Sequence, residues 1–204
     1  MSKLHPYEDR PVRPTRHYPC PRPTGAGEYL KEVDRRHFED AQIPPAYWKA
    51  PLGKIVAPQV LRVLKQYEDD LWNYLARGMG AYFFGPANSG KSAAAARLAE
   101  VAMRKGFTAL MVDSFTIREH LLNADGAGDL DKALRERNLV ILDNYRFPSS
   151  KVDATVCDWV QLRARYGQPT IITSRVTVRQ HQNGKTDLLP LLEHDLFPLY
   201  FQKR

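Results

Sequence analysis

The residues best suited to chemistry in this chain are the stretch Gly85-Pro86-Ala87-Asn88-Ser89-Gly90-Lys91-Ser92. The stretch matches G-x-x-x-x-G-K-[ST] in full, follows an apolar run and opens an alanine-rich segment. In such a loop, glycines let backbone N–H groups surround phosphate oxygens, and the following helix offers its positive N-terminal end. The lysine neutralises phosphate charge, and the Ser/Thr hydroxyl coordinates Mg²⁺. We therefore expect Lys91 to contact the β- and γ-phosphates of a nucleotide and Ser92 to hold the metal ion.

A second chemical signal is Asp143, which ends the apolar run "LVIL" (139–142) about 50 residues further along the chain. In P-loop folds, an Asp at the end of such a strand reaches the Mg²⁺ held by the loop, although a strand-ending Asp can also simply cap a turn. The next residue is Asn144, whose amide can hydrogen-bond a water molecule but cannot act as a base. Losing a general base costs on the order of 10²–10⁴-fold in rate. The pair predicts nucleotide binding with slow hydrolysis.

The elements that must position these residues alternate along the chain from residue 80 onward. Short apolar runs alternate with helices. The runs are continuously hydrophobic, which favours strands buried on both faces, and the helices between the runs favour a parallel sheet. The expected fold is α/β, a five-stranded parallel P-loop sheet flanked by helices. The predicted strands are 81–84, 108–112, 139–142, 170–173 and 198–201, and the predicted helices are 92–105, 115–123, 129–137 and 151–166.

Three regions follow from composition: a tail (1–27), leading helices (28–79) and the nucleotide-binding core (80–204). The tail is rich in proline and arginine without apolar periodicity, so we expect a flexible arm that either binds a partner or is simply solvated. In the leading region, a short helix should stop at the two prolines 44–45. A second helix should begin near Pro58 and end at Gly78.

The bulk composition limits the class of protein. A formal charge of +7 and a pI near 9.4 favour anionic partners such as nucleotides or nucleic acid. The two cysteines, Cys20 and Cys157, match no metal-binding spacing and are expected to be free thiols. No segment is apolar enough for a membrane span, and the N-terminus is too polar for a secretory signal. We expect a cytoplasmic protein.

Taken in order, several segments resemble the AAA+ ATPases of the DnaC/IstB type, which are replicative-helicase loaders and transposition helpers. The resemblance covers roughly residues 30–201. It is carried by "RRHFEDAQIPPAYW", by "GMGAYFFGPANSGKSAAAARLAEVAMRKGFTALMVDS", by "LDKALRERNLVILDN" and by "QPTIITSR".

The resemblance implies ATP and Mg²⁺ as cofactors, with Ser92 and Asp143 as metal ligands and Ile43 flanking the adenine together with Pro44. Ser174 and Arg175 would lie near the γ-phosphate, and Arg118 and His120 are candidate contacts to single-stranded DNA. The nucleotide-binding set is Ile43, Gly85, Pro86, Ala87, Asn88, Ser89, Gly90, Lys91, Ser92 and Ala93, and the catalytic set is Lys91, Asp143, Asn144 and Arg175.

Three positions depart from the pattern of the family. Asn144 replaces a second acid, Arg175 replaces the usual sensor asparagine, and Pro190 falls near the place of the arginine finger that acts between subunits. Arg175 or Arg179 could substitute for that finger. The family's small helical lid is not expected in this chain, which reaches only Arg204.

The leading functional hypothesis is a helicase loader that self-associates and uses its ATP state to control contact with a replicative helicase and single-stranded DNA. The alternatives are a transposition helper that assembles on double-stranded DNA, and an adaptor whose nucleotide is not hydrolysed. A small-molecule kinase would also need a mobile Arg-rich lid, for which the sequence offers no convincing candidate.

Overall fold

A computed structural model describes residues 32–122, 127–146, 150–184, 186 and 188–202. Its centre is a parallel sheet of five strands, as the sequence predicts, and the strands lie in the order β2-β3-β4-β1-β5. Every neighbouring pair is parallel, and Asp113 at the end of β2 is in register with Asp143 on β3. The strands are β1 (Gly80–Phe84), β2 (Ala109–Asp113), β3 (Leu139–Tyr145), β4 (Thr170–Ser174) and β5 (Leu196–Tyr200).

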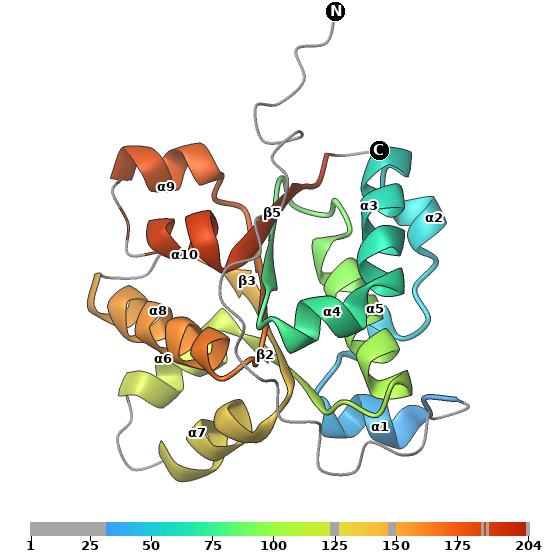
Figure 1. Ribbon diagram of the computed structural model, residues 1–204, viewed down its shortest axis with the longest axis horizontal. Helices are drawn as coiled ribbons and strands as arrows, with labels where there is room; N and C mark the ends of the chain where they lie inside the picture. The colour runs from blue at the N-terminus through green and yellow to red at the C-terminus, as the bar shows by residue number, and fades with distance from the viewer. Residues whose placement is uncertain (1–31, 123–126, 147–149, 185, 187, 203–204) are drawn as a thin grey trace, which may run out of the picture.

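Helices cover both faces of this sheet (Figure 1). One face is covered by α1 (Arg35–Asp40), α2 (Leu52–Ile55), α3 (Pro58–Asp69), α4 (Leu71–Ala76) and α5 (Lys91–Arg104), together with the 3₁₀ turn η1 (Pro45–Tyr47). The other face is covered by α6 (Ser114–Leu122), α7 (Ala127–Glu136), α8 (Ser150–Arg165), α9 (Val178–Gly184) and α10 (Leu189–His194). The described fold is thus a three-layer α/β arrangement.

Successive side chains of each strand point to opposite faces of the sheet, which divides the core into two clusters. On β1, Ala81 and Phe83 pack towards α5, whereas Tyr82 and Phe84 pack towards the helices of the other face. The same division holds on β3, where Leu139 and Ile141 join the first cluster. Because both faces are covered, the strands are apolar throughout, which is why their sequences show continuous runs and no alternation.

The leading region differs from the sequence prediction in two respects, of which the first is the short helix α2, which was not predicted. The single helix expected from Pro58 to Gly78 is two helices, because Asp70 leaves the helical conformation (φ −101°, ψ 15°) between α3 and α4. The expected short helix is α1, which already ends at Asp40, before the two prolines, and Pro45 opens η1. The tail of residues 1–27 lies outside the described residues.

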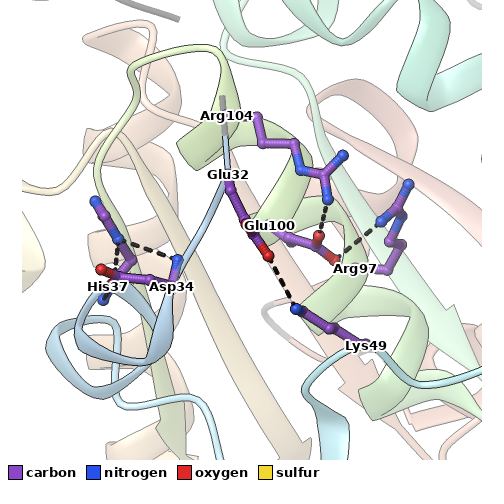
Figure 2. A network of polar contacts seen from close by, with 7 residues as sticks. All are labelled: Glu32, Asp34, His37, Lys49, Arg97, Glu100 and Arg104. Carbon is purple, nitrogen blue, oxygen red and sulfur yellow. Dashed lines mark hydrogen bonds and ion pairs between the residues drawn. The ribbon is translucent and has the colours of Figure 1, made fainter. Parts of the chain in front are cut away.

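Charged side chains on α5 form a network around Glu100 (Figure 2). Glu100 is only 3% exposed and accepts hydrogen bonds from Arg97 at 2.9 Å and Arg104 at 2.5 Å. Arg97 also donates to Glu68 on α3 at 3.2 Å. These bonds compensate the buried carboxylate and fix the helix that begins at the phosphate loop.

Among the described helices, none combines the length and the apolar character that a membrane crossing requires.

Candidate nucleotide site

The phosphate loop, residues 85–90, connects β1 to α5 at the carboxyl edge of the sheet. Its two glycines are required by geometry. Gly85 has φ 144°, and a Cβ there would lie 2.1 Å from the carbonyl oxygen of Phe201. Gly90 has φ 91°, and a Cβ there would lie 2.8 Å from Cγ2 of Val56 and 2.9 Å from Cγ2 of Ile55. Larger residues would therefore push the loop away from its supports.

Lys91 is 8% exposed, and its ammonium group is held by the loop itself. Its Nζ donates to the carbonyl oxygens of Gly85 at 3.0 Å and Pro86 at 2.6 Å, and to Ser89 Oγ at 3.2 Å. Burial lowers the pKa of Lys91, the positive charge of Arg175 lowers it further, and the Asp143 carboxylate opposes both effects. The charges of Arg175 and Asp143 therefore both act on the Lys91 ammonium group.

Asp143 lies on strand β3, which contacts α5 and pairs with β4. Its Oδ1 accepts a hydrogen bond of 2.6 Å from the hydroxyl of Thr173 on β4. Ser92 follows Lys91 in the first turn of α5 and is half-buried. A hydroxyl and a carboxylate are hard oxygen donors, which is the chemistry that Mg²⁺ prefers, so this donor set fits the metal.

The described residues contain no group of three or more His, Cys, Asp or Glu side chains that could hold a metal ion. The pair Ser92 and Asp143 does not depend on such a group, because Mg²⁺ is usually bound by one or two protein ligands together with phosphate oxygens and water.

Asn144 adopts the left-handed backbone conformation, with φ 53°, where the register between β3 and β4 shifts. Its backbone N–H donates to Thr173 Oγ1 at 2.8 Å, and its carbonyl accepts from Ser114 Oγ at 2.9 Å. Asn tolerates this conformation better than most residues. The backbone geometry thus gives a reason for an asparagine that is independent of catalysis.

Arg175 is exposed and follows β4, where the backbone is firmly held on both sides. Ser174 Oγ donates to the carbonyl of Tyr145 at 2.7 Å and accepts from the Val176 N–H at 3.1 Å. Tyr82 donates its hydroxyl to the Val176 carbonyl at 2.8 Å. The Arg175 backbone is therefore fixed near the loop, while its side chain remains accessible from solvent.

Three other predicted residues lie outside the phosphate loop. Ile43 is 2% exposed in the core, and its carbonyl accepts the Trp48 indole N–H at 2.7 Å. Arg118 and His120 lie on α6, which begins beside Asn144, and the side chain of Arg118 is outside the described part.

Sequence reasoning missed four residues that the structure places at the site. Ile55 and Val56 support Gly90, and no periodic signal marks so short a helix as α2. Thr173 donates to the carboxylate of Asp143, and Ser114 donates to the backbone carbonyl of Asn144, both near the end of β3. Thr173 lies near the end of β4, and Ser114 directly follows β2. The carboxyl ends of parallel strands meet at one edge, so that rule could have drawn attention to them.

Fold and loop together have the architecture of a P-loop nucleotide-binding domain, with a parallel sheet whose first strand leads through the phosphate loop into α5. Among solved structures, the chain is similar to the DnaC helicase loader, with a TM-score of 0.65 and 17% identity over 78% of this chain and 100% of that one. It is similar to a primosome component from Streptococcus pyogenes serotype M3, with a TM-score of 0.62 and 18% identity over 84% of this chain and 100% of that one.

A third similar structure is the replication initiator DnaA bound to AMPPCP and single-stranded DNA, with a TM-score of 0.61 and 14% identity. This match covers 79% of our chain and 51% of DnaA. No protein-family model matches the chain, and no curated protein matches it in sequence. At these identities the similarity shows a shared fold, and that fold is the one that the sequence resemblance predicts.

Proposed function

We propose that the protein binds ATP with Mg²⁺ and acts in DNA replication as a helicase-loader-like ATP switch with slow hydrolysis. The observation that carries the proposal is the complete phosphate loop between β1 and α5, in which Gly85 and Gly90 have positive φ and the buried Lys91 ammonium is held by oxygens of the loop. It occurs in a fold shared with the DnaC loader and with a nucleotide-bound DnaA.

Binding of phosphate is the first task of these residues. The three oxygens that now accept from Lys91 belong to the loop, so a phosphate group can replace them without moving the helix. Ser92 and Asp143 would hold the Mg²⁺, which when bound neutralises phosphate charge. The glycines and the N-terminus of α5 supply backbone N–H groups to the remaining oxygens.

Slow hydrolysis is expected from the groups that surround the γ-phosphate position. The Asn144 amide can orient a water molecule but cannot accept its proton. Arg175 supplies positive charge close to Lys91, so it can recognise the γ-phosphate or that of a neighbouring subunit. We therefore assign nucleotide recognition to Lys91 and Arg175. No residue of the predicted catalytic set is assigned as the general base that would deprotonate water.

The partners are inferred from the neighbours and from charge. The similar structures are named as a helicase loader, a primosome component and an initiator bound to single-stranded DNA. A basic chain with a net charge of +7 suits contact with DNA. We propose a replicative helicase and single-stranded DNA as partners, with self-association of the AAA+ type.

A Lys91→Ala variant tests the nucleotide part of this proposal. At an ATP concentration of about 100 Kd, binding should stabilise the wild type by about 2.7 kcal/mol, which raises Tm by roughly 5–10 °C. The variant should lose this shift, because it lacks the charge that meets the phosphates. Lys65→Ala, an exposed lysine on α3, is the matched control and should keep the full shift.

The same proteins separate the alternatives. Phosphate release above the Lys91→Ala level in the presence of DNA and helicase supports the switch, whereas none supports the adaptor. Binding to single-stranded DNA that depends on ATP supports the loader, whereas assembly on double-stranded DNA alone indicates the transposition helper. An unchanged Tm of the wild type with ATP and Mg²⁺ would overturn the nucleotide proposal itself.

A further inference from the structure

A buried threonine joins the metal carboxylate to the turned end of β3. Thr173 lies on β4 and is 1% exposed. Its Oγ1 donates to Asp143 Oδ1 at 2.6 Å and accepts from the Asn144 N–H at 2.8 Å. The direction of both bonds is fixed, because an ionised carboxylate only accepts and a backbone N–H only donates.

The fold does not by itself require a hydroxyl at this position. Thr173 pairs with Phe83 on β1 through the backbone, and its two preceding neighbours on β4 are the buried residues Ile171 and Ile172. A valine has the same shape and a high preference for strands. A buried hydroxyl costs free energy unless it is hydrogen-bonded, and here both bonds go to the end of β3. The hydroxyl of Thr173 is therefore explained by its two hydrogen bonds to the end of β3 and not by the packing of β4.

The two hydrogen bonds of Thr173 orient the Asp143 carboxylate and the backbone of Asn144. The register shift and the φ of 53° at Asn144 turn the backbone N–H of that residue towards Thr173. Ser114 holds the carbonyl of the same residue from the start of α6 at 2.9 Å. Since Asp143 precedes this turn directly, its carboxylate is fixed from the backbone side by the turn and from the side-chain side by Thr173.

We propose that Thr173 is the positioning residue of the metal-binding carboxylate. It donates to Oδ1 of Asp143 and would thereby fix the orientation of the carboxylate that, together with Ser92, would hold Mg²⁺. This inference rests on the proposed Mg²⁺-nucleotide function. It assigns Thr173 no contact with the nucleotide, and it predicts that the hydroxyl matters only for the part of ATP affinity that depends on Mg²⁺.

The test measures ATP affinity by titration calorimetry, with Mg²⁺ and with EDTA, for the wild type and three variants. Residues that orient metal ligands typically contribute 10–100-fold to affinity. Thr173→Val should lose at least about 10-fold of the Mg²⁺-dependent gain and little of the affinity in EDTA, whereas Thr173→Ser should keep both. Thr170→Val is the matched control, because Thr170 is also a buried hydroxyl on β4 but bonds Arg163 at the other end of the strand.

The possible outcomes distinguish failure of the role of Thr173 from failure of the proposed Mg²⁺-dependent nucleotide binding. If wild-type affinity is the same with Mg²⁺ and with EDTA, the metal part of the proposed function fails. If the wild type depends on Mg²⁺ and Thr173→Val depends on it equally, the function stands and the role of Thr173 is refuted. Should Thr173→Val not fold, Thr173→Ala replaces it, with the Mg²⁺ concentration that gives half of the ATP-induced Tm shift as readout. An unchanged concentration refutes the role, and a rise of about 10-fold that Thr173→Ser does not show supports it.

Discussion

Asn144 has two descriptions that lead to different experiments. By its side chain it is an amide at the place where the sequence resemblance implies an acid, and an amide predicts slow hydrolysis. By its backbone it is a left-handed residue, φ 53°, held by Thr173 and Ser114. Asp shares the tolerance of Asn for this conformation, whereas Glu does not. The residue type is therefore constrained by conformation as well as by chemistry.

Substitution of Asn144 separates the two constraints. Asn144→Asp should keep the fold and the ATP affinity, and it should raise phosphate release if the missing base limits the rate. Asn144→Glu should in addition lower the free energy of unfolding by about 1 kcal/mol, because a longer side chain is strained at positive φ. Urea unfolding and a phosphate-release assay measure the two effects. Brisk hydrolysis by the wild type would show that the amide is not limiting.

At the scale of elements, the buried side chain of Arg163 connects α8 to α7, β3 and β4 through hydrogen bonds. It lies on α8, is 2% exposed, and donates to backbone carbonyls at the end of α7 and at the starts of β3 and β4. It also donates to the Leu134 carbonyl and, at 3.2 Å, to the Thr170 hydroxyl. Burial lowers its pKa to about 9, which still leaves it charged at neutral pH. One guanidinium thus satisfies carbonyls from segments that would otherwise need other donors.

Removing Arg163 should therefore destabilise the protein without touching the nucleotide site. Arg163→Ala should cost about 3 kcal/mol or more, because several buried carbonyls lose their charged donor. Arg163→Lys should recover only part of this, since a single ammonium cannot reach the same set. Arg165→Ala, exposed on the same helix, should stay within about 0.5 kcal/mol of the wild type. Equal losses for the two alanine variants would contradict this account.

The elements were predictable from sequence to the extent that they are long and regular. β1, β3 and β4 were placed within one to three residues, because strands buried on both faces leave continuous apolar runs. The break at Asp70 was missed because the same apolar spacing continues across it. α2 and α9 carry too few residues for a periodic signal, so neither was predicted.

The candidate site shows the same limit. Lys91 and Ser92 are adjacent in sequence, and Asp143 follows a recognisable strand, so the motif predicts all three. Thr173 bonds Asp143 across 30 positions, and that contact depends on strand order and register, which one sequence does not specify.

At the scale of the whole molecule, acid stability should reflect one buried histidine. His181 on α9 is fully buried, with Nε2 2.7 Å from the Tyr82 hydroxyl and Nδ1 2.9 Å from Thr186 Oγ1. Burial lowers the pKa of His181 to about 4 from the usual value of 6.5. Between these values the unfolded chain binds more protons than the folded one, so stability must fall as the pH falls.

The expected loss is up to about 3 kcal/mol in the free energy of unfolding between pH 6.5 and pH 4, and it should level off below pH 4. His181→Gln should be less stable at pH 7 but should lack this part of the pH dependence. Urea unfolding at a series of pH values gives both curves. Parallel curves for wild type and variant would show that other groups cause the acid sensitivity.

The contact between Phe201 and Gly85 has a practical consequence. Phe201 donates its backbone N–H to the Phe84 carbonyl at 2.7 Å, and its own carbonyl lies against Gly85. Gln202, the next residue, is exposed, Cys157 is buried, and Cys20 would be replaced by serine so that it takes up no dye. A fluorescent dye on a cysteine introduced at position 202 would therefore lie one residue from the peptide that supports the phosphate loop. Occupancy of the loop could then be followed in real time without altering any group that binds the ligand.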